Sequence, residues 1–324
     1  MKNVIIGIHG LKNKPPKELL EKWWKISILD GLNNIGHHDA DFQFELVYWA
    51  DLEYPKSRDP EILDPKDPLF IEHPYITIRK AESPEKEPKI KRKILDTFEE
   101  GLDKIILHEK RIGGIEKIVD STIRRMFQDL DVYYYGFCKI DKEQIAQQAF
   151  RNRLIKVLQK HKQKRIMIIG HSMGSIIAYD TLIHEVPELK IDTFITIGSP
   201  LGFPLIIKKI LTEQNIKIHS NAKPPTPENL TSGWYNFSDL DDKITLNYDL
   251  ADDYLPNRQN IKPVDVVINN TYEYNGQKNP HKVYGYLQNE EVANVISGFL
   301  SKRTSFLARF FAGFFARFLE RFRS

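Results

Sequence analysis

The sequence predicts an α/β protein built on a mainly parallel β-sheet that is flanked by helices. Short, uninterrupted apolar runs alternate along the 324 residues with longer segments of helical periodicity. Uninterrupted apolar runs are typical of parallel strands, because both faces of such strands are buried. Hydrophobic residues make up 41% of the chain, which is enough to fill a substantial core.

The predicted strands and helices alternate in the order that this fold class requires. The apolar runs that we interpret as strands are residues 4–9, 44–49, 166–169, 193–197, 234–237 and 264–268. The segments that we interpret as helices are residues 16–32, 142–161, 174–184, 204–212 and 290–300.

Residues 52–131 interrupt this alternation with a polar stretch in which seven prolines lie between positions 55 and 88. Two helical patterns follow, near residues 94–108 and 115–130. A connection this long inside a compact domain is usually functional or disordered. We interpret it as a cap or lid inserted into a domain of residues 1–302. The alternative is a disordered loop followed by two packing helices.

Composition excludes several classes of protein. The net charge of +3 gives no strong field for binding nucleic acid, and the single cysteine, Cys138, permits neither an intrachain disulfide nor a Cys-rich metal site. The first residues turn polar too soon for a secretory signal, and no apolar run reaches the ~20 residues of a spanning helix. No cofactor-binding glycine loop is present. We therefore expect a cytoplasmic protein without metal, cofactor or nucleic-acid partner.

The most informative motif is Gly170-His171-Ser172-Met173-Gly174, which lies directly between an apolar run and a helical segment. A Gly-x-Ser-x-Gly sequence in this context predicts a sharp strand-to-helix turn that exposes the serine hydroxyl. Glycines at both ends let strand and helix approach closely. The turn also directs the helix N-terminus toward a reacting carbonyl group. Ser172 is therefore the predicted nucleophile.

Residues 170–180, Gly-His-Ser-Met-Gly-Ser-Ile-Ile-Ala-Tyr-Asp, resemble the nucleophile region of lipases and serine esterases of the α/β-hydrolase superfamily. The resemblance is to GPI-inositol-deacylase-like esterases and DDHD-type phospholipases, and it extends to Gly-Ser-Pro-Leu-Gly at 198–202. No Asp-Asp-His-Asp run occurs in the chain. The resemblance implies an α/β-hydrolase fold and ester hydrolysis through an acyl-enzyme.

Two backbone amides are expected to stabilise the oxyanion of such a reaction. One is the amide after the nucleophile, Met173. By resemblance of residues 5–11 to the His-Gly loop of lipases, the second is the Leu11 amide, with Gly10 as the alternative. His9 is expected to brace this loop, and His171 to face away from Ser172 in a structural role.

The remaining members of a catalytic triad follow the serine in the order acid, then histidine. His281 satisfies this order, and His219 is the less favoured alternative. Aligning Asp242-Lys243-Ile244 with the Asp-Pro-Val motif of the resembling lipases makes Asp242 the acid. Asp239 and Asp241 stay open as alternatives, because an aspartate-rich loop is also typical of a solvated turn.

The segment 303–324 is predicted to form an amphipathic helix. At about 100° per residue, its phenylalanines and leucines occupy one broad face opposite Arg309, Glu320 and Arg323. Such a helix is typical of segments that lie in a bilayer interface. Docking on the hydrolase body, self-association into a homo-oligomer, or insertion into a partner's groove are the alternatives.

Together these features predict a peripheral-membrane serine hydrolase that cleaves carboxylic esters, with a lipase or phospholipase activity implied by the resemblance and the tail. One alternative is a soluble esterase or thioesterase that acts on small acyl substrates. From another class, the alternative is a catalytically silent hydrolase fold that serves as a membrane-associated interaction module.

Overall fold

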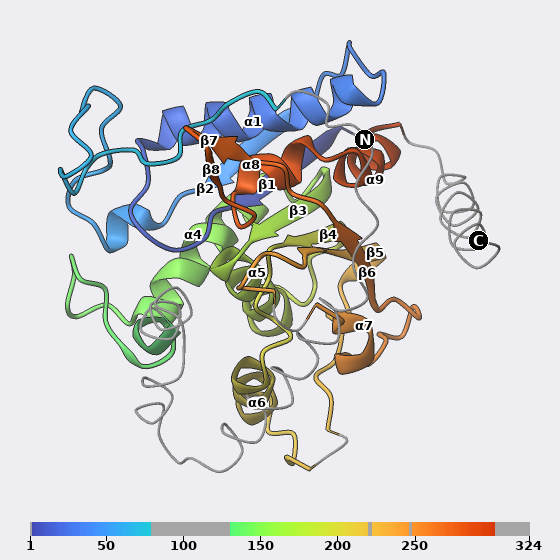
Figure 1. Cartoon of the computed structure of the whole chain (residues 1–324). Coiled ribbons are helices and arrows are strands. Elements are labelled where there is room, and N and C mark those ends of the chain that lie inside the picture. The colour runs from blue at the N-terminus through green and yellow to red at the C-terminus, as the bar shows by residue number, and fades with distance from the viewer. Residues whose placement is uncertain (1, 79–129, 220–221, 246–247, 302–324) are drawn as a thin grey trace.

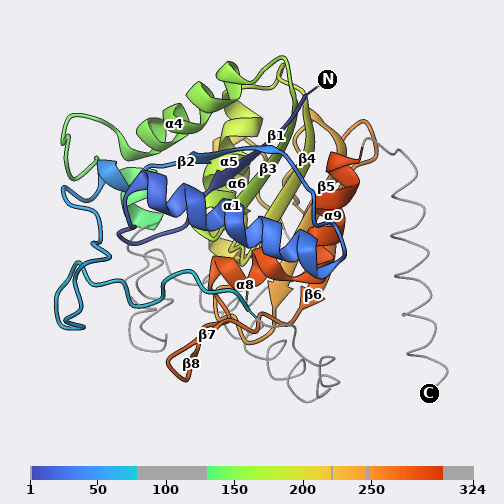
Figure 2. The ribbon, with the colours of Figure 1, turned by 90° about the horizontal axis from the view of Figure 1, so that it is seen from above.

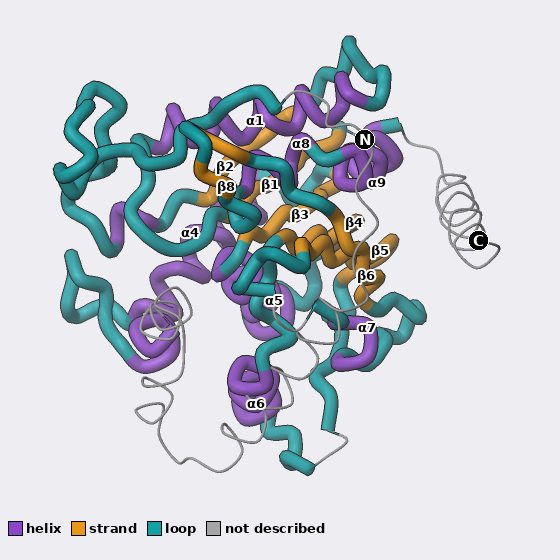
Figure 3. The backbone as a smooth tube through the Cα atoms, viewed as in Figure 1, coloured by secondary structure: helices purple, strands orange, loops and turns teal. Residues whose placement is uncertain are grey.

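A computed structural model shows a central parallel sheet enclosed by helices on both sides (Figure 1 and Figure 3). It describes residues 2–78, 130–219, 222–245 and 248–301. Each neighbouring pair of strands is parallel. In spatial order the strands are β2 (Gln43–Val47), β1 (Asn3–Ile8), β3 (Arg165–His171), β4 (Ile191–Ile197), β5 (Leu230–Asp239) and β6 (Pro263–Ile268).

The helices divide between the two faces of the sheet, and α1 lies over the strands in the view of Figure 2. One face is covered by α1 (Lys17–Asn34), α8 (Val283–Gln288) and α9 (Glu290–Leu300). The other face is covered by α4 (Ala146–Lys160), α5 (Met173–His184) and α6 (Pro204–Glu213). The short helices η1 (Ala50–Leu52) and α7 (Leu250–Asp253) lie in connections.

The apolar runs of the sequence fill two cores because successive side chains on a strand point to opposite faces. Ile5 and Met167 pack toward α1, α8 and α9, whereas Ile6 and Ile168 pack toward α4, α5 and α6. All four side chains are fully buried. The prediction of a mainly parallel sheet flanked by helices is confirmed, with all six predicted strands in it.

Helix α8 and a short hairpin were not predicted. Helix α8 begins two residues after His281, and β7 (Glu273–Tyr274) pairs with β8 (Gln277–Lys278) as an antiparallel hairpin. Asn275 and Gly276 connect these strands with φ values of 50° and 73°. Asn-Gly is the usual sequence of a two-residue hairpin turn with positive φ at both positions, so the sequence does carry the signal for this hairpin.

The predicted insertion is described only in part. Residues 53–78 contain no helix or strand, and several of their groups attach them to α1 and to the region around α8. The Tyr75 hydroxyl donates to Asp30, and Gln288 exchanges two hydrogen bonds with the backbone of Ile76 and Ile78. Residues 79–129 of the predicted cap and the predicted tail helix 303–324 lie outside the described residues. Among the residues that are described, no helix is both long and apolar enough to cross a membrane.

A buried ionic network joins the three helices on the α5 side of the sheet. Arg151 on α4 lies 3.0 Å from Asp180 on α5 and 3.4 Å from both Glu185 and Glu213. The Tyr133 hydroxyl donates to Asp180 over 2.9 Å. Burial raises the pKa of Asp180 to about 6 even beside the arginine. The network therefore fixes α5, the helix that begins directly after Ser172, against its two neighbours.

Replacing Arg151 by methionine should leave the Asp180 carboxylate buried without its closest cation. At pH 8, where Asp180 is ionised, we expect the free energy of unfolding to fall by about 3–5 kcal/mol. Urea unfolding followed by circular dichroism measures this loss. Arg153→Met on the same helix is the control, because the Arg153–Asp51 pair is exposed and is worth less than about 1 kcal/mol. Equal losses in the two variants would contradict the role of the network.

Candidate active site

Ser172 lies at a sharp turn between the end of β3 and the start of α5. Its backbone adopts φ 54° and ψ −128°, a conformation that non-glycine residues rarely adopt. Strain of this kind costs ~1–3 kcal/mol and persists only where surrounding contacts hold it. The Ser172 amide donates to the Ile197 carbonyl on β4 over 3.1 Å, and the Ser175 hydroxyl donates to the Ser172 carbonyl over 2.6 Å.

Close packing around the turn explains its two glycines. A Cβ atom at Gly170 would lie 2.7 Å from the Ser175 Cα, and one at Gly174 would lie 2.3 Å from the Ile8 carbonyl oxygen. Neither contact is sterically possible, so α5 and β1 can approach the turn only with glycine at these positions. The strand–turn–helix context that the motif requires is therefore present.

His281 follows β6 in the chain and reaches the same site from the other side. Its Nδ1 donates to the Asp242 carboxylate, at 2.8 Å from Oδ2 and 3.0 Å from Oδ1. With the proton on Nδ1, the neutral ring leaves Nε2 as the acceptor. The His281 side chain is 29% exposed, whereas the Asp242 side chain is fully buried. The arrangement is that of a histidine held in one tautomer by a buried acid.

The three candidate acids have different places in the loop after β5. Asp242 also accepts hydrogen bonds from the Ile244 amide and from the Tyr286 hydroxyl. Asp239 accepts instead from the backbone amides of Asp241 and Asn270, and burial raises its pKa to about 6. Asp241 is exposed. The structure thus brings Asp242 to the histidine and uses Asp239 to hold the loop.

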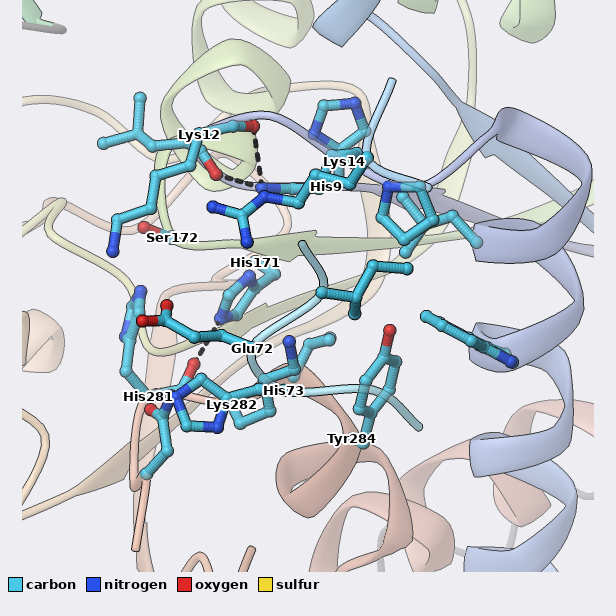
Figure 4. A pocket seen from close by; sticks show the side chains of 18 of the residues that line it. His9, Lys12, Lys14, Glu72, His73, His171, Ser172, His281, Lys282 and Tyr284 are labelled. Atoms are coloured by element: carbon cyan, nitrogen blue, oxygen red, sulfur yellow. Dashed lines mark hydrogen bonds between the residues drawn. The ribbon is translucent and has the colours of Figure 1, made fainter. Parts of the chain in front are cut away.

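Ser172 and His281 border one cavity of about 180 Å³ (Figure 4). The structure describes both residues, and it shows no hydrogen bond between the Ser172 hydroxyl and the His281 ring. Catalytic hydrogen bonds of this type often form only when substrate is bound. His219, the alternative base, is not among the residues that line this cavity.

The loop after β1 carries the Leu11 amide, one of the two expected oxyanion donors. The Trp49 amide donates to His9 Nε2 over 3.1 Å, so His9 Nδ1 carries the proton and donates to the Gly10 carbonyl over 2.8 Å. A trans peptide places its N–H opposite its C=O, so this bond turns the Leu11 amide away from His9. Burial lowers the pKa of His9 well below its ordinary value, which keeps the ring neutral.

The donor positions predicted at Leu11 and Met173 lie near the serine. Leu11 lines the cavity beside Ser172, and Met173 is the first residue of α5, where helical amides have no partner within the helix. A Cβ atom at Gly10 would lie 2.7 Å from the Ser172 Cβ, so only glycine lets the loop approach the turn this closely. His9 braces the loop, as its hydrogen bonds show.

His171 has a more specific place than the sequence suggested. Its ring lines the same cavity as Ser172, and its Nε2 donates to the His281 carbonyl over 2.9 Å. The centroids of the His171 and His281 rings are 4.7 Å apart. Burial, followed by the neighbouring His281, lowers the pKa of His171 well below its ordinary value. A neutral His171 thus holds the backbone of His281, the candidate base, in place.

Two further residues shape the site without having been predicted. The Tyr286 hydroxyl donates to the Asp242 carboxylate over 2.8 Å and accepts from the Asp239 backbone amide, so it connects the acid loop to α8. Gly198, after β4, has a φ of 54°, and a Cβ there would lie 3.0 Å from the Asp242 Oδ2 and 3.1 Å from the His281 Nδ1. The sequence signal for Gly198 was its position directly after the predicted strand 193–197.

Within the described part of the chain, no group of three or more His, Cys, Asp or Glu residues is arranged to hold a metal ion. His37, the first residue of a His-His-Asp sequence at positions 37–39, forms a hydrogen bond with Ser297.

Comparison with known proteins gives a match to a protein family. Residues 135–225 match the family described as PGAP1-like alpha/beta domain. No curated protein and no solved structure matches the chain significantly. The matched region runs from α4 to α6 and contains Ser172, but it ends before Asp242 and His281. With the six-stranded parallel sheet, the match shows an α/β-hydrolase fold and indicates a hydrolase of the α/β type.

Substitution of Gly198 by alanine should disturb the His281–Asp242 pair measurably. Alanine at positive φ costs ~1–2 kcal/mol, and crowding of a packed site costs a further ~1–3 kcal/mol. The control is Gly276→Ala, because Gly276 has a φ of 73° but nothing within 4 Å of the added Cβ. We expect Gly198→Ala to lower the free energy of unfolding by at least about 1 kcal/mol more than Gly276→Ala. Equal losses of stability in the two variants would mean that the His281–Asp242 pair does not restrict the space at Gly198.

Proposed function

We propose that the protein is a serine hydrolase that cleaves carboxylic esters through an acyl-enzyme, with Ser172, His281 and Asp242 as its triad. The observation that carries the proposal is the buried Asp242 carboxylate on His281 Nδ1, in a cavity that is bordered by Ser172 at a strained turn. The order of the residues along the chain supports the proposal. The serine follows β3, the acid follows β5 and the histidine follows β6, which is the order found in this fold.

In the first half of the reaction, the unprotonated Nε2 of His281 accepts the Ser172 proton while the serine oxygen attacks the ester carbonyl. Negative charge develops on the carbonyl oxygen, where the amides of Leu11 and Met173 are the proposed donors. The Asp242 carboxylate stabilises the imidazolium that forms. Proton transfer from His281 to the alcohol then releases it and leaves an acyl-enzyme.

In the second half, water replaces the alcohol. The partly exposed ring of His281 accepts a proton from water as the water oxygen attacks the acyl carbonyl, and the same proton returns to Ser172 as the acid leaves. The hydrogen bond from His171 to the His281 carbonyl and the hydroxyl of Tyr286 on Asp242 support this geometry throughout.

The lipid substrate is supported by the resemblance to lipases and by the amphipathic sequence of residues 305–324. The volume of the cavity favours the second candidate, a soluble esterase or thioesterase acting on small acyl groups. About 180 Å³ is below the roughly 300–1,000 Å³ of drug-sized ligand sites. A short acyl group fits such a space.

Removal of the nucleophile should abolish the activity, and removal of the acid should reduce it. Ser172→Ala should show no ester hydrolysis above background and no labelling by a fluorophosphonate probe. Asp242→Asn should lower kcat by about 10⁴-fold, because the histidine then loses its tautomer. The control is Asp241→Asn, which should stay within a few-fold of the wild type. A folded wild type that neither hydrolyses short 4-nitrophenyl esters nor reacts with the probe would support the catalytically silent alternative.

The proposed action at a membrane surface predicts that residues 303–324 provide attachment. The full-length chain should float with liposomes that contain anionic lipid, whereas a chain ending at residue 302 should remain in the soluble fraction. The same pair should differ in hydrolysis of phospholipid vesicles and agree on short soluble esters. Equal flotation of both chains would contradict the proposed role of the tail.

A further inference from the structure

The cavity beside Ser172 carries more positive than negative side chains. Among the described residues that line it, Lys12, Lys14, Arg58 and Lys282 are cationic, and Glu72 is the one carboxylate (Figure 4). The Lys14 ammonium already donates to two backbone carbonyls of its own loop. The other three, Lys12, Arg58 and Lys282, are named the cation cluster below.

Arg58 and Lys282 lie in this cavity without a neutralising carboxylate. Within the described residues, neither forms an ion pair with an aspartate or a glutamate. Arg58 Nη1 donates to the Phe70 carbonyl over 2.6 Å, but its buried Nε has no hydrogen-bond partner there. The Lys282 ammonium lies 4.9 Å from the centre of the Tyr284 ring, which stabilises a cation without cancelling its charge.

The members of the cluster act on one another electrostatically. Burial first, and then the charges of Arg58 and Lys12, lower the pKa of Lys282 to about 7, whereas Glu72 opposes this by less. Like charges that converge in a partly buried place destabilise one another unless an opposite charge joins them. Glu72 is exposed and does not outweigh them. Arg58 and Lys282 therefore lack a counter-ion of matching strength among the described residues.

Part of the cavity wall is apolar. Leu20 and Trp24 on α1 and Val283 on α8 line it, and all three are buried. One cavity thus offers both hydrocarbon contacts and positive charge. An acyl chain fits the apolar wall, which leaves the cation cluster for the alcohol half of an ester.

We propose that the substrate is the ester of a negatively charged alcohol, whose phosphate or carboxylate group binds Lys12, Arg58 and Lys282 while its acyl chain lies against α1. This proposal rests on the proposed ester hydrolysis at Ser172 and specifies its substrate class. Arg58 supplies a planar fork of donors suited to phosphate and carboxylate oxygens, and the two lysines supply compact charges.

The test compares matched short esters that differ only in charge. One pair is 1-butanoylglycerol and its 3-phosphate, and the other is methyl 3-butanoyloxypropanoate and its free carboxylate. We expect kcat/KM of the wild type to be at least tenfold higher for the charged member of one pair, mainly through a lower KM. The preferred pair shows whether phosphate or carboxylate is the group recognised.

Variants of the cluster show whether it carries the preference. Arg58→Gln and Lys282→Gln should each bring the charged-to-neutral ratio of kcat/KM close to one. Lys156→Gln, an exposed lysine on α4 that does not line the cavity, is the matched control and should keep the wild-type ratio. Fluorophosphonate labelling of each variant reports whether its active site is intact.

The possible failures are distinguishable. Hydrolysis of all four esters by the wild type with equal kcat/KM within each pair would overturn the charged substrate and leave the hydrolase. A preference that survives in both cluster variants would overturn the assignment to these residues. Absence of hydrolysis together with absence of labelling would overturn the proposed function itself.

Discussion

The backbone at Ser172, held at φ 54° between β3 and α5, is the constraint on which the rest of the site depends. A lone turn would relax from this conformation at a gain of ~1–3 kcal/mol. Here the parallel sheet, the hydrogen bond to Ile197 and the hydroxyl of Ser175 oppose relaxation. The Ser175 hydroxyl also contacts Ser199, so the turn is connected to the loop after β4, where Gly198 leaves room for the His281–Asp242 pair.

Much of the fold could be predicted because its signals are local. Each strand is a short apolar run, and the Gly-x-Ser-x-Gly motif specifies its own strand–turn–helix context. The order of serine, acid and histidine along the chain was enough to select His281 as the candidate base. The sequence alone could not separate Asp242 from Asp239 and Asp241, because all three lie in one loop and only tertiary contacts decide which carboxylate reaches the histidine. The Asn275-Gly276 turn was predictable and was missed.

The supporting residues were beyond sequence reasoning for a physical reason. His171 reaches the carbonyl of a residue 110 positions away, and Tyr286 reaches Asp242 across 44. Such contacts depend on the packing of α8 against the site rather than on any local pattern. The cation cluster is similar, since Lys12, Arg58 and Lys282 come from three separate segments. Only the folded chain shows that positive charge and apolar side chains line one cavity beside the serine.

The most direct test of the central claim is an experimental structure of the protein after reaction with an alkyl phosphonate, which resembles the tetrahedral intermediate. The account predicts phosphorus bonded to Ser172 Oγ, one phosphonate oxygen about 2.7–3.1 Å from the amide nitrogens of Leu11 and Met173, and His281 Nε2 within hydrogen-bond reach. A phosphonate on another residue, or a His281 ring turned away from the adduct, would contradict it.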